Sequence, residues 1–290
     1  MENSKTPSFA LTEAERERLR KLAALNTRFY AAVASSFSET RKSKWPGWDR
    51  LVEFLLDERP FDDEADGYSL PSAFSVLDVA CGNMRFESYL QEKFPASRLH
   101  FCAIDNCASL ANDGAAVGAG DAADVRFVER DVLQTVMSCD GSLGRGLPSG
   151  FDMTVCFGFF HHILSQDLRF ALLRELVELL DGGGVCCISL WRFADDERLA
   201  KKAEIATKAA IDQGIVFADD LREGDYLLGW QERSDVFRCC HSFSDDEVRA
   251  LVDSVADTAE LALEYRADGK SADLNTYLVF SRHRVRQRRN

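Results

Sequence analysis

The chain lacks the sequence features that mark membrane proteins and disulfide-rich secreted proteins. No apolar run approaches the roughly 20 residues that span a bilayer, and the polar start MENSKTPSF has no signal-peptide core. We therefore expect a cytoplasmic protein without membrane contact. The 9 cysteines are odd in number and form no C-x-x-C pair, which favours reduced thiols and argues against both a disulfide framework and a metal site.

Two glycine-rich phosphate-binding motifs are also absent. Neither the phosphate-binding loop G-x-x-x-x-G-K-[ST] nor the dinucleotide pattern G-x-G-x-x-G occurs, which argues against nicotinamide-dependent chemistry. The net charge of −13 argues against a surface that binds nucleic acid everywhere. Two basic clusters stand apart from this acidic chain, Arg41 with Lys42 and Lys44, and the arginines of residues 281–290. They would either bind a polyanion locally or remain solvated.

Residues 75–90, SVLDVACGNMRFESYL, predict a strand, a tight glycine turn and a helix. Val76, Leu77 and Val79 are typical of a buried strand. Gly82 lets the backbone approach a ligand closely, and the helix N-terminus offers unpaired N–H groups. Asp78 adds an acceptor at the end of the strand. A turn with one glycine and one preceding acid suits a ligand without phosphates.

Two further acids follow predicted strands. Asp105 closes the strand 99–105 about twenty residues after the glycine turn, where an acid accepts hydrogen bonds from ribose hydroxyls in doubly wound folds. Asp131 comes just after the third strand, 124–128. Each acid alone could be a turn or N-cap residue. Because the carboxyl ends of parallel strands meet at one edge of a sheet, we expect Asp78, Asp105 and Asp131 to converge on one ligand.

The order of the elements predicts an α/β fold. Strands at 151–157 and 185–191 flank a leucine-rich helix, and strands at 259–265 and 275–280 are close enough in sequence to pair antiparallel. This rhythm predicts a doubly wound, mostly parallel seven-stranded sheet. Residues 1–70 would form an N-terminal helical lid, and residues 71–290 would form the main domain, with a cap insertion at about 193–243.

The predicted lid begins with a capping box at Thr12 and Glu15. The long amphipathic helix that follows ends near Ser36, and one of its faces carries Leu19, Leu22, Asn26, Phe29, Tyr30 and Val33. A second helix begins at Pro46. The segment between them alternates aromatic and cationic residues. It would either join a helical hairpin on the sheet edge or cover a ligand, with Arg41 holding a carboxylate and Trp45 stacking on an adenosine.

Taken together, these motifs resemble the class I S-adenosylmethionine-dependent methyltransferases over roughly residues 74–282. The resemblance implies the Rossmann-like methyltransferase fold and S-adenosyl-L-methionine as cofactor. It implies that the methionine part of the cofactor contacts Asp78, Ala80, Gly82 and Asn83. Asp105 would bind the ribose and Asp131 the adenine amino group, while Phe157 and Gly158 would line the site. The sequence departs from the family at Met84, where a small residue is usual and a side chain would narrow the pocket.

The flanking segments are similar to the tRNA wobble-uridine carboxymethyl methyltransferases. The likeness is carried by Phe29-Tyr30, by Phe37-Ser38-x-Thr40-Arg41-x3-Trp45-Pro46, by His161-His162 and by Arg238-x-x-His241-x-Phe243. It implies methylation of a carboxymethyl group on a tRNA wobble uridine, aided in eukaryotic members by a small activator protein. The implied catalytic residues are Arg41, as the carboxylate clamp, with His161 or His162 as a positioning donor. Trp45, Trp191, Arg238 and His241 would contact the substrate.

Several of these assignments have structural alternatives. One histidine of the His161-His162 pair could cap a helix while the other packs in the sheet crevice. Arg238 and His241 could form an ion-pair and capping arrangement. The whole site could instead methylate a small metabolite, which the acidic composition favours. A cofactor-binding but inactive scaffold subunit is a third alternative, and Met84 is the feature that keeps it open.

Overall fold

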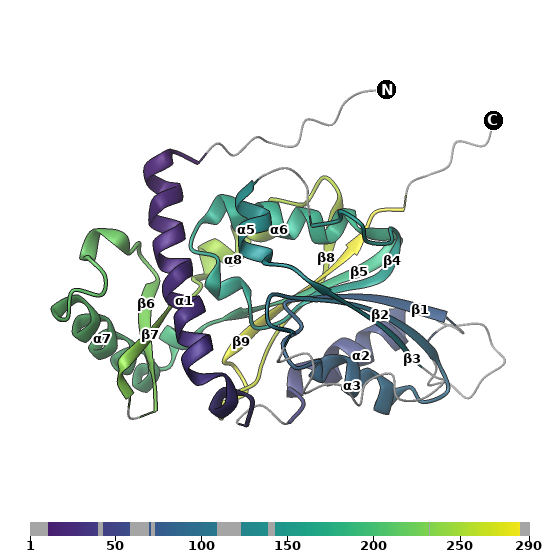
Figure 1. The fold of residues 1–290 in the computed structure, drawn as a ribbon. Helices are drawn as coiled ribbons and strands as arrows, with labels where there is room; N and C mark the ends of the chain where they lie inside the picture. Colours follow the sequence, from purple (N-terminus) through teal and green to yellow (C-terminus); the bar gives the residue numbers. More distant parts are fainter. Residues whose placement is uncertain are drawn as a thin grey trace.

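A seven-stranded sheet forms the centre of the molecule, in the order β3-β2-β1-β4-β5-β9-β8 (Figure 1). This computed structural model describes residues 11–39, 43–58, 70, 73–108, 123–138, 143–231 and 233–284. The strands are β1 (Ala73–Val79), β2 (Arg98–Asp105), β3 (Ala123–Glu129), β4 (Phe151–Cys156), β5 (Leu180–Trp191), β8 (Ala259–Ala267) and β9 (Asn275–Arg282). The first five pair in parallel, and β9 runs antiparallel between β5 and β8. The predicted doubly wound, mostly parallel seven-stranded sheet is confirmed.

Helices cover both faces of this sheet (Figure 1). The first layer contains α5 (Val132–Ser138), α6 (Gln166–Glu178) and α8 (Asp245–Asp253), and the second contains α2 (Pro46–Glu58) and α3 (Arg85–Lys93). Alternate residues of β1 pack against the two helical layers, because successive side chains of a strand point to opposite faces of the sheet. Leu77 and Val79 pack in the first layer's core, and Val76 packs in the second.

The two helices of the predicted lid lie in different layers. The long helix α1 (Glu13–Glu39) buries Leu19 and Leu22 in the core of α6 and α8, whereas α2 packs with α3. Arg18 fixes the start of α1, because its guanidinium donates to the carbonyls of Leu164, at 2.6 Å, and Asp220, at 2.9 Å. The helix therefore connects the α6 layer with residues 193–243, the predicted cap insertion.

The predicted cap insertion, residues 193–243, contains more regular structure than the sequence predicts. Helix α7 (Glu197–Asp212) is where a polar helix is expected, but β6 (Asp225–Trp230) and β7 (Arg233–His241) form a two-stranded antiparallel sheet that the sequence analysis missed. Three short 3-10 helices, η1 (Phe160–His162), η2 (Phe193–Asp195) and η3 (Ala218–Asp220), complete the described structure. Figure 1 shows β7 running alongside α1, so these two elements bring their side chains together.

Other differences from prediction concern the ends of elements. Helix α1 extends beyond Ser36, and β5 begins at Leu180, five residues before the strand predicted at 185–191. The register between β4 and β5 shifts between Phe151 and Met153, and this bulge accommodates the extra residues. None of the described helices has the length and apolarity needed to cross a bilayer.

Candidate functional site

The turn after β1 is built on three left-handed residues at alternate positions. Ala80, Gly82 and Met84 have φ angles of 62°, 56° and 53°. Left-handed backbone suits glycine and strains residues with a Cβ atom. A Cβ atom built on Gly82 would meet no atom within 4 Å. The turn therefore presents bare backbone to open space at the carboxyl edge of the sheet.

The side chain of Met84 points away from this opening. It is buried against Cys81 and Ala103, beside Val125 and Phe127. Met84 does not line the cavity described below, although Cys81, Gly82 and Asn83 do. The expectation that Met84 narrows the pocket is therefore wrong, because its left-handed backbone turns the side chain into the core.

The three acids converge as predicted. Asp78, Asp105 and Asp131 all line one cavity of about 1100 Å³ at the carboxyl ends of β1, β2 and β3. Asp105 shapes the turn, since its carboxylate accepts hydrogen bonds from the N–H groups of Gly82 and Cys107, both at 2.9 Å. Burial raises the pKa of Asp105, while these backbone donors act in the opposite direction. Asp131 caps α5 by accepting from the N–H of Gln134 at 3.0 Å.

Aromatic rings enclose the same cavity beside β4. Phe157 packs edge to face on Phe86, with ring centroids 4.9 Å apart, and lies 5.8 Å from Trp48. Trp45 stacks on Trp48 at 5.6 Å and covers Gly158 so closely that a Cβ atom there would lie 3.0 Å from its ring. The cavity thus has a polar wall at the glycine turn and an aromatic wall at α2 and β4.

Arg85 is a cation of this cavity that the sequence analysis missed. Its guanidinium donates to the side-chain oxygen of Asn83 at 3.1 Å and to the carbonyl of Ser43 at 3.0 Å. It also lies over the rings of Trp45 and Trp48, at 5.5 and 5.8 Å. Burial lowers the pKa of Arg85. The only signal in the sequence was its place at the start of a helix after a glycine turn.

A second polar group lines the far end of the cavity, where α1 meets β7. The buried guanidinium of Arg238 donates to the hydroxyl of Tyr30 at 2.7 Å. It also lies over the rings of Phe29, at 5.2 Å, and Trp191, at 5.5 Å. Although burial lowers the pKa of Arg238, its neighbours outweigh that effect and the pKa is raised. The guanidinium of Arg238 therefore stays positively charged although aromatic rings surround it.

Asn26 and Tyr30 both contact His162. The side chain of Asn26 accepts from the N–H of Cys239 at 2.7 Å and donates to its carbonyl at 3.0 Å, which sets the orientation of the amide. The amide nitrogen is also 3.2 Å from Nδ1 of His162, and Nδ1 lies 3.4 Å from the carbonyl of Cys239. Nε2 of His162 is 2.8 Å from the hydroxyl of Tyr30, which also accepts from Arg238. Asn26, His162, Tyr30 and Arg238 therefore form one connected hydrogen-bonded group.

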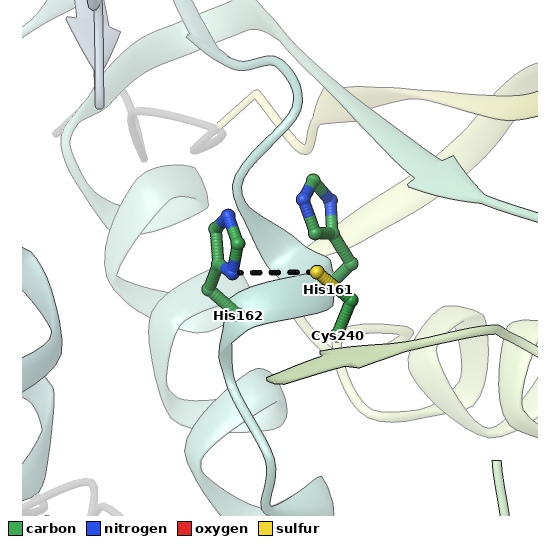
Figure 2. Close-up of side chains that lie close together, drawn as sticks. All are labelled: His161, His162 and Cys240. Atoms are coloured by element: carbon green, nitrogen blue, oxygen red, sulfur yellow. Dashed lines mark hydrogen bonds between the residues drawn. The ribbon is translucent and has the colours of Figure 1, made fainter. Parts of the chain in front are cut away.

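His161 and His162 lie beside Cys240 of β7 (Figure 2). Nitrogen and sulfur atoms of these three buried side chains lie within 4.8 Å of one another, and Sγ of Cys240 is 3.9 Å from Nδ1 of His162. Both nitrogens of His162 already have hydrogen-bond partners in Asn26 and Tyr30. The cluster is therefore organised as a hydrogen-bonded group. His161 packs against Trp191, with centroids 5.0 Å apart.

The structure brings together nearly all the residues that the sequence singled out for ligand contact. The cavity is lined by Asp78, Ala80, Gly82, Asn83, Asp105, Asp131, Phe157, Gly158, Trp45, Trp191, His161, His162 and Arg238. His241 is placed elsewhere. It is buried between Asp225, at 2.8 Å, and Glu247, at 2.7 Å, and joins the cap sheet to α8. Arg41 lies outside the described residues.

Comparison with known sequences finds distant relatives. No family model matches the chain. It is 25% identical over 205 residues to the tRNA (carboxymethyluridine(34)-5-O)-methyltransferase ALKBH8 of Mus musculus, covering 71% of this chain and 25% of that protein. It is 26% identical over 166 residues to an Arabidopsis thaliana protein named tRNA (carboxymethyluridine(34)-5-O)-methyltransferase, covering 57% of this chain and 32% of the relative. The chain thus spans a quarter to a third of the length of these relatives.

Comparison with solved structures finds the same fold. A SAM-dependent methyltransferase from Methanosarcina mazei matches with a TM-score of 0.55 and 14% identity, covering 74% of this chain and 95% of that one. The 1,6-didemethyltoxoflavin-N1-methyltransferase of Burkholderia thailandensis, solved with S-adenosylhomocysteine, matches with a TM-score of 0.52 and 17% identity, covering 95% and 93%. The chain therefore has the fold of the class I S-adenosylmethionine-dependent methyltransferases, and its sequence resembles the tRNA wobble-uridine methyltransferases.

Proposed function

We propose that this chain is an S-adenosylmethionine-dependent methyltransferase that esterifies a carboxymethyl group on a tRNA wobble uridine. One observation carries the proposal: a single cavity has an acidic glycine turn at one end and the buried cation Arg238 at the other. The names of the relatives and structural neighbours support the enzyme class and the cofactor. The tRNA substrate is carried over from the relatives.

The residues at the glycine turn fit S-adenosylmethionine. Gly82 leaves space for close approach of the ligand, and Asp105 is already aligned at the end of β2, where an acid accepts from ribose hydroxyls. Asp131 offers an acceptor for an adenine amino group. Trp45, Trp48 and Phe157 supply an apolar wall. When bound, the cofactor supplies an electrophilic methyl group on its sulfonium.

The residues at the other end of the cavity fit a carboxylate acceptor. A carboxylate is ionised at neutral pH, so its oxygen attacks without losing a proton. The task left to the protein is to align this oxygen and exclude water. Arg238 would neutralise the oxygen that does not attack, and the Tyr30–His162 pair would hold Arg238 in place. Trp191 offers a ring on which a uridine base can stack.

This assignment moves the carboxylate clamp from Arg41 to Arg238. Arg238 is buried at the cavity and its donors are directed by Tyr30. A role for Arg41 stays a prediction, as do the small activator protein and the cytoplasmic location.

A second candidate function is methylation of a small carboxylic acid. The aromatic lining of the cavity and the chain's net charge of −13 favour such a substrate over a large polyanion. The inactive scaffold loses its main support, since the side chain of Met84 does not enter the cavity.

Transfer of labelled methyl from S-adenosylmethionine to tRNA that carries carboxymethyluridine tests the proposal. We expect base-labile label with the wild-type protein and a loss of at least about 100-fold in kcat/KM for Arg238→Met, equivalent to the roughly 3 kcal/mol that a buried charge-assisted contact contributes. Arg233→Met is the matched control, because Arg233 is on the same strand but is exposed and pairs with Asp235.

Retained S-adenosylhomocysteine binding by Arg238→Met would establish that this variant is folded. Label in a base-stable position, or full activity of Arg238→Met, would contradict the carboxylate mechanism. Transfer to small acids but not to tRNA would favour the second candidate.

A further inference from the structure

A buried carboxylate just after β8 organises one wall of the cavity and has no part in the mechanism above. Asp268 is 6% exposed and lines the cavity. It accepts hydrogen bonds from the N–H of Gly47 at 3.0 Å, the hydroxyl of Tyr277 at 2.6 Å and the side-chain amide of Asn275 at 2.8 Å. Burial and the charge of Asp268 raise the pKa of Tyr277 well above its usual range, so this hydroxyl keeps its proton and donates it. Asp268 therefore acts as an acceptor towards all three neighbours.

The carboxylate of Asp268 sets the orientation of the Asn275 amide. Only the nitrogen of an amide can donate to a carboxylate, so Nδ2 faces Asp268 and Oδ1 takes the opposite position. Asp268 is the only hydrogen-bond partner of this amide in the described part of the chain. Oδ1 is not sealed from solvent, whereas Oγ1 of the adjacent Thr276 is. Oδ1 and the second N–H of Nδ2 are therefore available to a ligand in the cavity.

Asn275 lies beside the ring on which we place the uridine base. It is the register partner of Trp191 across β5 and β9, and both residues line the cavity. Directly opposed residues of antiparallel strands project from the same face of the sheet, with their Cβ atoms about 4.5–5.5 Å apart. Arg238, the proposed carboxylate clamp, lies over the ring of Trp191 at 5.5 Å. A planar base that stacks on Trp191 would thus present an edge to Asn275.

The oriented amide is complementary to one kind of pyrimidine edge. Its oxygen requires a ring N–H donor, and its nitrogen requires a carbonyl acceptor next to that donor. Uracil offers both, because its N3–H lies between the O4 and O2 carbonyls. Cytosine does not, because its N3 is an acceptor and would face the amide oxygen with a second lone pair. Rotation of the amide would relieve this mismatch, but Asp268 holds the nitrogen in place.

We propose that Asn275 recognises the imide edge of the substrate uracil by two hydrogen bonds, and that Asp268 is the positioning residue that orients it. Oδ1 accepts from N3–H, and Nδ2 donates to the adjacent carbonyl. Side-chain hydrogen bonds to a Watson–Crick edge, combined with stacking, are the usual means by which proteins recognise an unpaired base. The inference rests on the proposed function, because the uridine acceptor comes from it, and it adds selection of uridine over cytidine.

Titration with three nucleosides measures this contact directly. The three are 5-carboxymethyluridine, 5-carboxymethylcytidine and 5-carboxymethyluridine methylated on N3, and all carry the same carboxylate. We expect the first to bind roughly 10- to 100-fold more tightly than the other two, which is the discrimination typical of a pair of hydrogen bonds to a base edge. The N3-methyl compound keeps both carbonyls, so its loss of affinity isolates the N3–H contact.

Substitutions separate the contact from the stability of the wall. Asn275→Leu removes the amide at similar size and should abolish the preference for uridine. Asp268→Asn should weaken the preference, because an amide at position 268 can donate to Oδ1 and allow Asn275 to turn around. Tyr277→Phe is the matched control: it removes another donor to Asp268, but Tyr277 does not line the cavity, so the preference should equal that of the wild type. Binding of S-adenosylhomocysteine establishes that each variant is folded.

Equal affinity of the wild type for the three nucleosides, or binding of none of them, would overturn the inference without any variant. A preference for uridine that survives in Asn275→Leu, or that is lost equally in Tyr277→Phe, would also overturn it. A wild type that prefers 5-carboxymethyluridine but transfers no methyl group to it from S-adenosylmethionine, either as the nucleoside or within tRNA, would contradict the proposed function and leave the base contact standing.

Discussion

Replacing Met84 by glycine tests whether this residue serves the fold or obstructs the ligand. Glycine relieves about 1–2 kcal/mol of left-handed strain but costs roughly 0.5–1 kcal/mol in chain entropy. It also removes a buried side chain packed on Cys81 and Ala103, a loss of about 2–5 kcal/mol for truncation to alanine. The central values of these terms predict that Met84→Gly lowers the free energy of unfolding by about 3 kcal/mol. Because the side chain does not line the cavity, affinity for S-adenosylhomocysteine should not rise.

Ala80→Gly is the matched comparison, at a position with nearly the same φ angle but with only a methyl group to lose. Its strain relief of about 1–2 kcal/mol exceeds the entropic cost, so a gain of about 0.5–1 kcal/mol is expected. Denaturant unfolding measures both changes, and calorimetry measures the affinity. A more stable Met84→Gly protein, or one that binds the ligand tenfold more tightly, would refute the reasoning.

Two further predictions concern positions outside the turn. Gly47→Ala should destabilise the protein by about 1–3 kcal/mol in denaturant unfolding, because the added Cβ would lie 2.4 Å from the buried ring of Tyr277. Unchanged stability would show that the start of α2 is not packed tightly against Tyr277. Burial raises the pKa of Glu247, but the hydrogen bond and charge of His241 prevail and lower it to about 2. Its contribution, up to about 3 kcal/mol, should be present above the unfolded-state pKa and lost as the pH falls from about 5 to 2. The free energy of unfolding of Glu247→Gln should not fall in this way over the same pH range. If the variant and the wild type show identical pH profiles, that result would count against the ion pair between Glu247 and His241.

The sequence predicted the fold where local pattern and tertiary structure agree. The strand, turn and helix around Gly82, the acids Asp105 and Asp131, and the cap formed by Thr12 and Glu15 all depend on residues close together in the chain. These signals are set by backbone conformation and by hydrogen bonds to near neighbours. These features can therefore be predicted from the sequence without knowing which distant residues come into contact.

The acceptor end of the site was harder to predict because it is assembled from distant elements. Asn26 and Tyr30 lie on the otherwise apolar face of the first helix. A polar residue on such a face was the pattern in the sequence that could have indicated a buried hydrogen-bond network. Their partners, Cys239 and Arg238, are more than 200 residues away along the chain. The missed hairpin β6–β7 carries those partners, so no local pattern linked Tyr30 to Arg238.

His241 and Met84 illustrate a different limit. Residue type suggested a ligand contact for the first and an obstruction for the second. The outcome depends on where each side chain points, and this is decided by strand register for His241 and by a left-handed φ angle for Met84. Composition and spacing do not encode either direction.

Nucleoside mass analysis of tRNA from cells with and without this protein tests the central claim most directly. The account predicts that wobble uridines carry the carboxymethyl ester when the protein is present. In its absence, and in cells that contain only Arg238→Met, the free carboxymethyl acid should accumulate, lighter than the ester by one CH2 unit because a hydrogen replaces the methyl group. Identical tRNA modification in all three strains, while the purified protein binds S-adenosylmethionine, would contradict the tRNA assignment and point to a small carboxylic acid as the substrate.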